Sequence, residues 1–323
     1  MTVGAENLTL AGGTLKDVTS SLAGNIALTA DSTFTATNAG DTLTLSGVIS
    51  GNGYGITKSG AGTVVLSNAN TYTGATNVDA GTLTVSGSLS DSTAVTVASG
   101  ATYNVNASDT VGSIAGAGTI TTTASSGTVT LSAGNDNTST SFTGVLQNGS
   151  NALLALTKVG SGTLTLGNSG SNSTYSGGTT VSAGTLKAGS SYQPFGTAGV
   201  TVSSGATLDV AGQTLSNSLT LSGTGVSGYA LMNSSATQGV IDGAVTLSGA
   251  TTVGGSNPLK ISGVISGASK ALTVAGTSTV TLTNTETYTG ATTIDSGATL
   301  QLGDGTTAGT LASASAITDN GTL

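Results

Sequence analysis

The fold is decided by the stretch from Thr44 to Ser86, which reads TLSGVISGNGYGITKSGAGTVVLSNANTYTGATNVDAGTLTVS. In this stretch Val64 and Leu66 alternate with Thr63, which is the period of a β-strand with one buried face. Gly, Asn, Ser and Asp separate this run from similar ones, as turn residues separate short strands. The stretch therefore predicts short β-strands that bury Val64 and Leu66 and turn Thr63 outward.

The same anchors recur in the same order in three blocks. The blocks span residues 44–86, 142–189 and 261–303, and degenerate coils of the same kind fill the intervals between them. Each block has Gly-Val-Ile or Gly-Val-Leu, then Tyr-Thr-Gly or Tyr-Ser-Gly, then a closing Thr-Leu run. Repeats of this length are typical of solenoids, in which each coil buries its apolar face on the next.

The inward positions favour a parallel β-solenoid over a sandwich or an up-and-down barrel. They are Val, Leu, Ile and Ala, whereas sandwiches and barrels need tight hairpins and bulky core residues. We therefore predict that residues 1–323 form a single continuous β-solenoid. At about 20 to 25 residues per coil, the chain would make roughly 13 to 16 coils.

The composition agrees with an all-β chain and excludes several classes of protein. Gly supplies 51 of the 323 residues and Pro only 2, while a hydrophobic fraction of 36% argues against a disordered linker. The net charge of −8, with six Lys or Arg residues in all, predicts no nucleic-acid partner. Because the chain has no Cys, neither disulfides nor thiolate metal sites can stabilise it.

The N-terminal residues carry neither the basic region nor the apolar core of a secretion signal. No stretch approaches the roughly 20 apolar residues of a membrane helix. We expect any secretion signal to lie outside this chain.

The first two blocks carry a motif of a known family. Residues 57–63 read TKSGAGT and residues 70–74 read NTYTG, while residues 157–164 read TKVGSGTL. With these residues the chain resembles autotransporter passengers that carry the passenger-associated transport repeat. The third block departs from the motif, because residues 275–279 read AGTST in place of the Lys-containing turn.

This resemblance implies a right-handed parallel β-helix that a Gram-negative bacterium exports to its surface or secretes. It also implies a C-terminal membrane barrel that this chain does not contain, so that membrane attachment would run only through the missing barrel. The family includes adhesins, surface-layer-like proteins, toxins and proteases, so the resemblance leaves the activity open.

The residue inventory predicts that the chain is not an enzyme. His and Cys are absent, so no Ser-His-Asp triad or Cys nucleophile can form. The acidic residues are scattered, and we interpret Asp79 and Asp295, which share a repeat position, as solvated turn residues rather than a glycosidase pair. Asp-Gly turns such as Asp242-Gly243 lack the calcium-binding repeat. We predict no catalytic residue, no cofactor and no metal site.

Lysine and tyrosine recur at fixed places in the repeats, and more than one role is open for each. Lys58 and Lys158 precede a turn, where we interpret them as keeping strand edges soluble; binding an anionic glycan or capping carbonyl groups are the alternatives. Tyr72, Tyr175 and Tyr288 read as turn anchors, with a stacking platform for sugars as the alternative.

One irregular segment is a candidate for a local surface contact. Residues 190–196 read SSYQPFG and predict a loop excursion, in which Tyr192, Pro194 and Phe195 are the candidate contact residues.

The leading hypothesis is a non-catalytic surface passenger that acts as an adhesive or structural rod. Its partners would be a host or bacterial surface, glycans, or like chains. The alternative is a self-assembling subunit of an extracellular filament or surface layer, with end-to-end or lateral association, and a β-helical carbohydrate-active enzyme is a third hypothesis.

Overall fold

The computed structural model describes residues 2–3, 6–167, 170–312 and 316–323. Within these residues the regular elements are short β-strands, the strand pairs that we describe below are parallel, and no helix is present. The strands stack as a β-solenoid of about 15 turns in all, which confirms the predicted fold class.

The chain divides into two compact units. The first unit comprises residues 1–162 and 170–177, and the second comprises residues 163–169 and 178–323. Each unit is a stack of coils in its own right. The single continuous solenoid over residues 1–323 stays a prediction.

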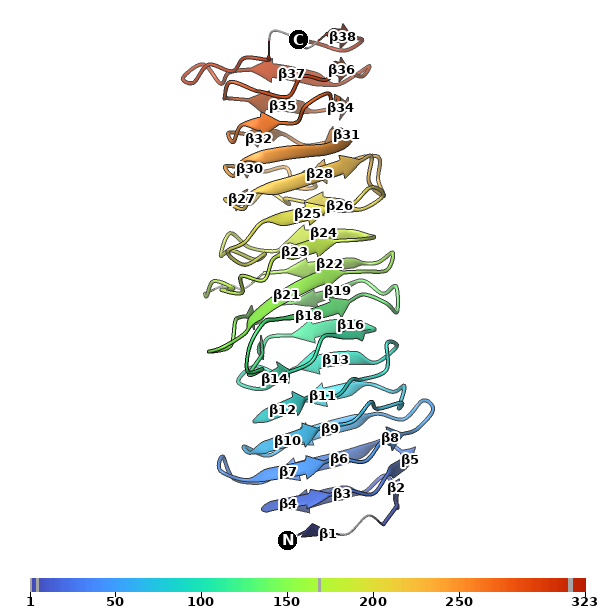
Figure 1. Cartoon of the computed structure of the whole chain (residues 1–323). Coiled ribbons are helices and arrows are strands. Elements are labelled where there is room, and N and C mark those ends of the chain that lie inside the picture. Colours follow the sequence, from blue (N-terminus) through green and yellow to red (C-terminus); the bar gives the residue numbers. More distant parts are fainter. Residues whose placement is uncertain (1, 4–5, 168–169, 313–315) are drawn as a thin grey trace. The chain divides into compact units, whose positions relative to one another are not determined.

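The first unit contains an eight-stranded parallel sheet with one strand from each successive coil. Figure 1 shows β4, β7, β10 and β12 of this sheet, one above the next. Its strands are β1 (Thr2–Val3), β4 (Thr19–Leu22), β7 (Thr42–Leu45), β10 (Thr63–Leu66), β12 (Thr82–Val85), β14 (Thr102–Val105), β17 (Thr119–Thr121) and β20 (Val145–Leu146).

Two further sets of strands complete the coils of the first unit. The shorter set is a three-stranded sheet of β2 (Leu8–Ala11), β5 (Ile26–Ala30) and β8 (Ile49–Ser50). The longer set consists of β3 (Thr14–Asp17), β6 (Ser32–Ala36), β9 (Ile56–Ser59), β11 (Thr76–Val78), β13 (Ala94–Val97), β15 (Asp109–Val111), β16 (Ser113–Gly116), β18 (Thr128–Ala133), β19 (Thr140–Phe142) and β21 (Leu153–Lys158).

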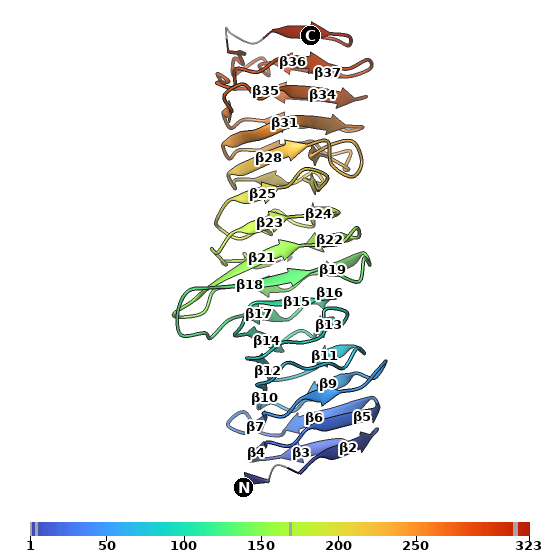
Figure 2. The same cartoon turned by 45° about the vertical axis from the view of Figure 1, so that its right-hand side comes forward.

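The second unit repeats this construction. Its five-stranded sheet consists of β27 (Thr214–Leu215), β30 (Gly239–Ile241), β32 (Leu259–Ile261), β35 (Thr279–Leu282) and β37 (Thr299–Leu302). Its other strands are β22 (Thr163–Leu166), β23 (Thr179–Val181), β24 (Thr185–Ala188), β25 (Val200–Val202), β26 (Thr207–Asp209), β28 (Leu219–Gly223), β29 (Leu231–Met232), β31 (Val245–Gly255), β33 (Ile265–Ser266), β34 (Leu272–Gly276), β36 (Thr292–Ile294) and β38 (Ile317–Asp319). Figure 2 shows β25, β28, β31 and β34 in order up this unit.

Register places like residues above like residues in the core. In the first unit Leu43 pairs with Val64, Val64 with Leu83 and Leu83 with Tyr103, and all four side chains are buried. Each such aliphatic side chain contributes about 1.5–3 kcal/mol when it is fully buried. The alternation predicted for Thr63, Val64 and Leu66 is confirmed, because the two apolar side chains are buried and the threonine is half-buried.

The glycine of the Gly-Val-Ile anchor is required by a close approach between coils. A Cβ atom on Gly47 would lie 2.1 Å from the carbonyl oxygen of Gly24, and one on Gly263 would lie 1.9 Å from that of Gly243. Both distances are far inside a van der Waals contact, so only glycine allows the chain to pass here. This accounts for the anchor's recurrence as a packing requirement.

Candidate functional site

The recurrent tyrosines lie in the core at a corner of the coil, between two strands of the repeat. Tyr72 precedes β11 and Tyr288 precedes β36, and both side chains are fully buried. The phenol oxygen of each shares a 2.7 Å hydrogen bond with a threonine hydroxyl, that of Thr76 in the first repeat and of Thr292 in the third. Burial raises the pKa of Tyr72 well above its usual value, so the phenol is neutral.

Tyr175 in the middle repeat is also fully buried. Its N–H donates to the carbonyl oxygen of Leu146 at 3.3 Å, as the N–H of Tyr72 does to that of Ile49. The tyrosines are therefore turn anchors, as the sequence predicted. A stacking platform for sugars is excluded for them, because no ring face reaches solvent.

Two residues before each tyrosine, a buried polar side chain joins neighbouring coils. Its identity differs between the repeats, being Asn70 in the first, Ser173 in the middle and Glu286 in the third. In each case its oxygen accepts the N–H of the last residue of the Gly-Val-Ile or Gly-Val-Leu anchor, which is Ile49, Leu146 and Ile265 respectively.

Asp109 makes the same kind of joint between the repeats. Its Oδ2 accepts the N–H of Leu89 at 2.9 Å, and burial raises the pKa of its carboxyl to about 6. The sequence analysis did not single out Asp109 or Glu286. The sequence did carry one signal for Glu286, because it stands two residues before Tyr288, as Asn70 stands two residues before Tyr72.

Lys58 is buried rather than exposed at a strand edge, so the interpretation that it keeps the edge soluble is wrong. In the ladder its position lies between Phe34 and Val78. Its Nζ donates to the carbonyl oxygens of Ser59 at 2.9 Å, and of Gly60 and Ala80 at 2.8 Å. The alternative of carbonyl capping is therefore confirmed, and the buried ammonium has no room for a glycan.

Lys158 is buried in the same way, and its Nζ donates to the carbonyl oxygens of Val159 at 2.6 Å and Gly160 at 2.9 Å. Burial lowers the pKa of both lysines to about 8. In the third repeat Val274 occupies this position, because it pairs with Ile294 as Lys58 pairs with Val78. An aliphatic side chain thus fills the same space without a charge.

The carboxylates of the described residues form no cluster that could bind a metal ion. No group of three or more Asp and Glu side chains comes together there in a way that could hold a metal ion. Asp304, for example, is paired within the chain: its Oδ1 accepts the backbone N–H groups of Thr306 and Thr307, and Nζ of Lys260 donates to its Oδ2 at 2.8 Å. These bonds hold the pKa of Asp304 well below its usual range.

The three candidate contact residues of the irregular segment 190–196, which precedes β25, differ in their exposure to solvent. Tyr192 is 46% exposed, whereas Pro194 and Phe195 are buried. The carbonyl oxygen of Phe195 accepts the hydroxyl of Thr179 at 3.2 Å, which ties the segment to its coil. Of the three, Tyr192 alone exposes its side chain to solvent, and its role as a contact residue stays a prediction.

The outer face of the second unit carries a column of hydroxyl groups, which we call the hydroxyl column. Pairing between β23, β25, β28, β31 and β33 aligns one hydroxyl residue from each strand. On four of the strands a serine follows two residues later, in the sequences TVS, TVS, TLS and TLS. The column is half-buried or exposed, contains no charged residue, and consists of Thr180, Thr201, Thr220, Thr246 and Ser266.

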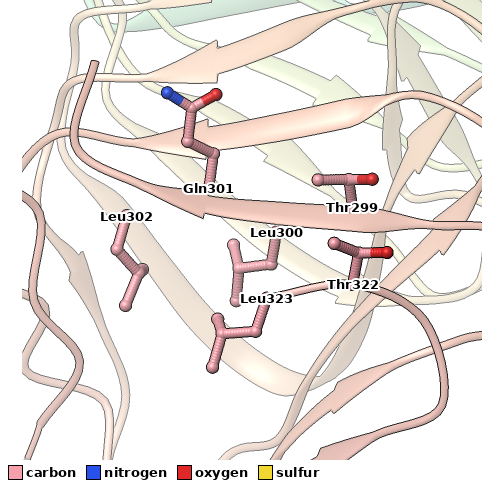
Figure 3. Close-up of a pocket in the computed structure, with 6 residues that line it drawn as sticks. All are labelled: Thr299, Leu300, Gln301, Leu302, Thr322 and Leu323. Atoms are coloured by element: carbon pink, nitrogen blue, oxygen red, sulfur yellow. The ribbon is translucent and has the colours of Figure 1, made fainter. Parts of the chain in front are cut away.

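A hollow lies beside β37 in the second unit. It is lined by Thr299, Leu300, Gln301, Leu302, Thr322 and Leu323. Figure 3 shows the three leucines on one side of the strand, with Gln301 extending to the other. None of the lining residues is ionisable, so the hollow offers no general acid, general base or nucleophile pair.

Comparison with known proteins identifies the repeats. Residues 56–85, 156–188 and 272–302 match the passenger-associated transport repeat family. The repeats of the chain are those of autotransporter passengers that carry this family of repeat. In the structure the three matches begin in β9, β21 and β34, and each match includes the buried tyrosine of its repeat.

One curated relative is the adhesin BmaC autotransporter of Brucella suis biovar 1 (strain 1330), which is 36% identical over 197 residues. The match covers 56% of this chain but only 5% of the relative's length. No solved structure matches the chain. Among the described residues, no helix is long and apolar enough to cross a membrane.

Proposed function

We propose that this chain is a non-catalytic part of an autotransporter passenger that lies at the surface of a Gram-negative bacterium and makes adhesive contacts with glycans. The observation that carries the proposal is the hydroxyl column on β23, β25, β28, β31 and β33. The relative's printed name, an adhesin, and the family of the repeats support it.

The chemistry of the hydroxyl column suits a polyhydroxylated partner. Each hydroxyl can donate one hydrogen bond and accept others, so it can match a sugar hydroxyl in either sense. Successive coils repeat such a group at about 4.8 Å, which offers many weak contacts along one polymer. Because the column has no charge, contacts with a neutral glycan would be little affected by salt.

A binding experiment with the purified chain tests this proposal. The triple variant Thr201→Val, Thr220→Val and Thr246→Val removes three hydroxyls but keeps the shape and β-propensity of the side chains. We expect it to lose at least tenfold in affinity on a glycan array and on host-cell surfaces, since three hydrogen bonds contribute about 0.5–1.5 kcal/mol each.

The matched control replaces three hydroxyl residues of another column in the same unit. Thr273, Thr293 and Thr318 pair in register on β34, β36 and β38, and their change to Val should leave the affinity within about twofold. Equal losses in the two triple variants, or binding that survives in both, would count against the hydroxyl column. Concentration-dependent sedimentation of the wild type would instead favour the self-assembling subunit.

A further inference from the structure

The corner of the third repeat has a buried carboxyl group where the first repeat has a buried amide. The main chain around the two is bonded in the same way. The N–H groups of Tyr72 and of its predecessor both donate to the carbonyl oxygen of Ile49, and those of Tyr288 and its predecessor donate to that of Ile265. The two corners therefore present the same set of main-chain groups to different side chains.

In the first repeat the amide of Asn70 is fully paired. Its Oδ1 accepts the N–H of Ile49 at 3.0 Å, while its Nδ2 donates to the carbonyl oxygens of Asn68 at 2.8 Å and Ser88 at 3.1 Å. The backbone N–H of Asn70 also donates to Ser88, at 2.9 Å. At this corner the side chain therefore accepts one hydrogen bond and donates two.

In the third repeat Glu286 supplies the acceptor but, when ionised, no donor. Its Oε2 accepts the N–H of Ile265, and its backbone N–H donates to the carbonyl oxygen of Thr310 at 2.9 Å, as Asn70 does to Ser88. The side chain is 1% exposed, and Oε1 is buried without a partner. An ionised carboxylate cannot donate, so it would supply no counterpart of the two bonds that Asn70 Nδ2 donates in the first repeat.

The charged groups near this corner do not compensate a negative Glu286. Burial raises the pKa of its carboxyl to about 7, and the hydrogen bond from Ile265 is the opposing influence. Tyr288 is a buried titratable neighbour, and its pKa is raised first by burial and further by the charge of Glu286. On β32 Lys260 pairs with Asp304 at 2.8 Å rather than with Glu286.

We propose that Glu286 is held in the folded chain as a neutral carboxylic acid, whose Oε1–H donates to the carbonyl oxygen of Asn284 or Thr310. The protonated carboxyl thereby reproduces the accepted bond of the Asn70 amide and one of its two donated bonds. Ionisation removes the donor and leaves a buried charge, which loosens the corner. The third repeat is therefore a proton-dependent joint between coils, whereas the first repeat is not.

The direction of the pH effect follows from the two protonation states. The pKa of Glu286 in the folded chain lies above the value of 4.5 for a free side chain, so the folded chain keeps a proton that the unfolded segment has released. The corner is most stable below about pH 4.5, loses stability as the pH rises to about 7, and changes no further above that. Local opening should increase on the order of 10²-fold across this window.

Carboxyl NMR on the full chain labelled with [13C]glutamate tests the protonation state directly. Glu286 and the exposed Glu6 are the glutamates of the sequence, so two signals are expected. The Glu286→Gln variant assigns them by removing one. We expect the Glu286 signal to titrate near pH 7; a midpoint at or below 4.5 would overturn the proposal.

Hydrogen exchange, corrected for intrinsic rates and compared at pH 5.5 and 7.5, tests the joint. We expect opening around Ile265 to increase at least tenfold in the wild type and to stay constant in Glu286→Gln. The reciprocal variant Asn70→Glu should bring the same pH dependence to Ile49. A wild type and a Glu286→Gln variant that respond alike to pH would refute the joint even if Asn70→Glu fails to fold.

Discussion

The first repeat, residues 56–85, and the third, residues 272–302, share the backbone contacts of the tyrosine corner, and two of the buried positions at which they differ bear on its stability. Lys58 in the first corresponds to Val274 in the third, and Asn70 corresponds to Glu286. The close glycine approaches and the tyrosine corner are the same in both. The difference teaches that the close glycine contacts and the tyrosine define the coil. Different buried side chains can then occupy the same place in it.

The largest expected effect comes from the glycines after the tyrosine corners. A Cβ on Gly74 would lie 2.2 Å from the carbonyl carbon of Tyr54, and one on Gly290 would lie 2.1 Å from the carbonyl oxygen of Lys270. We expect Gly74→Ala and Gly290→Ala each to cost more than about 4 kcal/mol of local stability, measured by hydrogen exchange.

Gly40→Ala is the matched control, because nothing lies within 4 Å of its added Cβ. It should be neutral or slightly stabilising. A large loss at Gly74 with none at Gly290 would show that the two corners do not share one backbone.

The next largest effect is expected at the buried lysine. Lys58→Met keeps most of the side-chain volume but leaves three carbonyl groups without their donor, so we expect a loss of about 2–4 kcal/mol. Lys187 is the control, since its side chain is 37% exposed and its ion pair with Asp209 is 3.6 Å long. Lys187→Met should cost less than about 1 kcal/mol. Similar small losses in both variants would mean that the capping by Lys58 contributes little.

The smallest effect concerns the tyrosine hydroxyls. Tyr72→Phe and Tyr288→Phe each remove one hydrogen bond to a threonine and should each cost about 1 kcal/mol. Exchange rates of the amides in β11 and β36 measure this. Because the two bonds have the same length, unequal losses would indicate that the corners differ in more than their polar side chains.

Much of the fold could be predicted from the sequence because period and repetition are local signals. The alternation at Thr63, Val64 and Leu66 indicated which side chains face the core, and the structure agrees. The tyrosines were predicted to be turn anchors because a residue that recurs at the same position of each repeat usually has a structural role in the coil. Thr281 is an exception, since it alternates as an outward residue and yet is buried.

The interpretation of Lys58 failed because lysine is rarely buried, and the sequence does not show which carbonyl groups converge on its ammonium. Glu286 was missed for a similar reason, since its environment is defined by a neighbouring coil. Phe195 was grouped with Tyr192 as a contact residue, yet adjacent loop residues can face opposite ways. For Lys58 and Glu286, contacts with a neighbouring coil contribute to the role, and the local sequence does not show them.

The central claim is that the recurrent buried residues build the coil while the hydroxyl column makes the contact. Binding of the folded Lys58→Met variant to a glycan array, beside the triple Val variant of the hydroxyl column, tests it most directly. The account predicts that Lys58→Met binds within about twofold of the wild type while the triple variant loses at least tenfold. Loss of binding in folded Lys58→Met, with the triple variant unaffected, would contradict it.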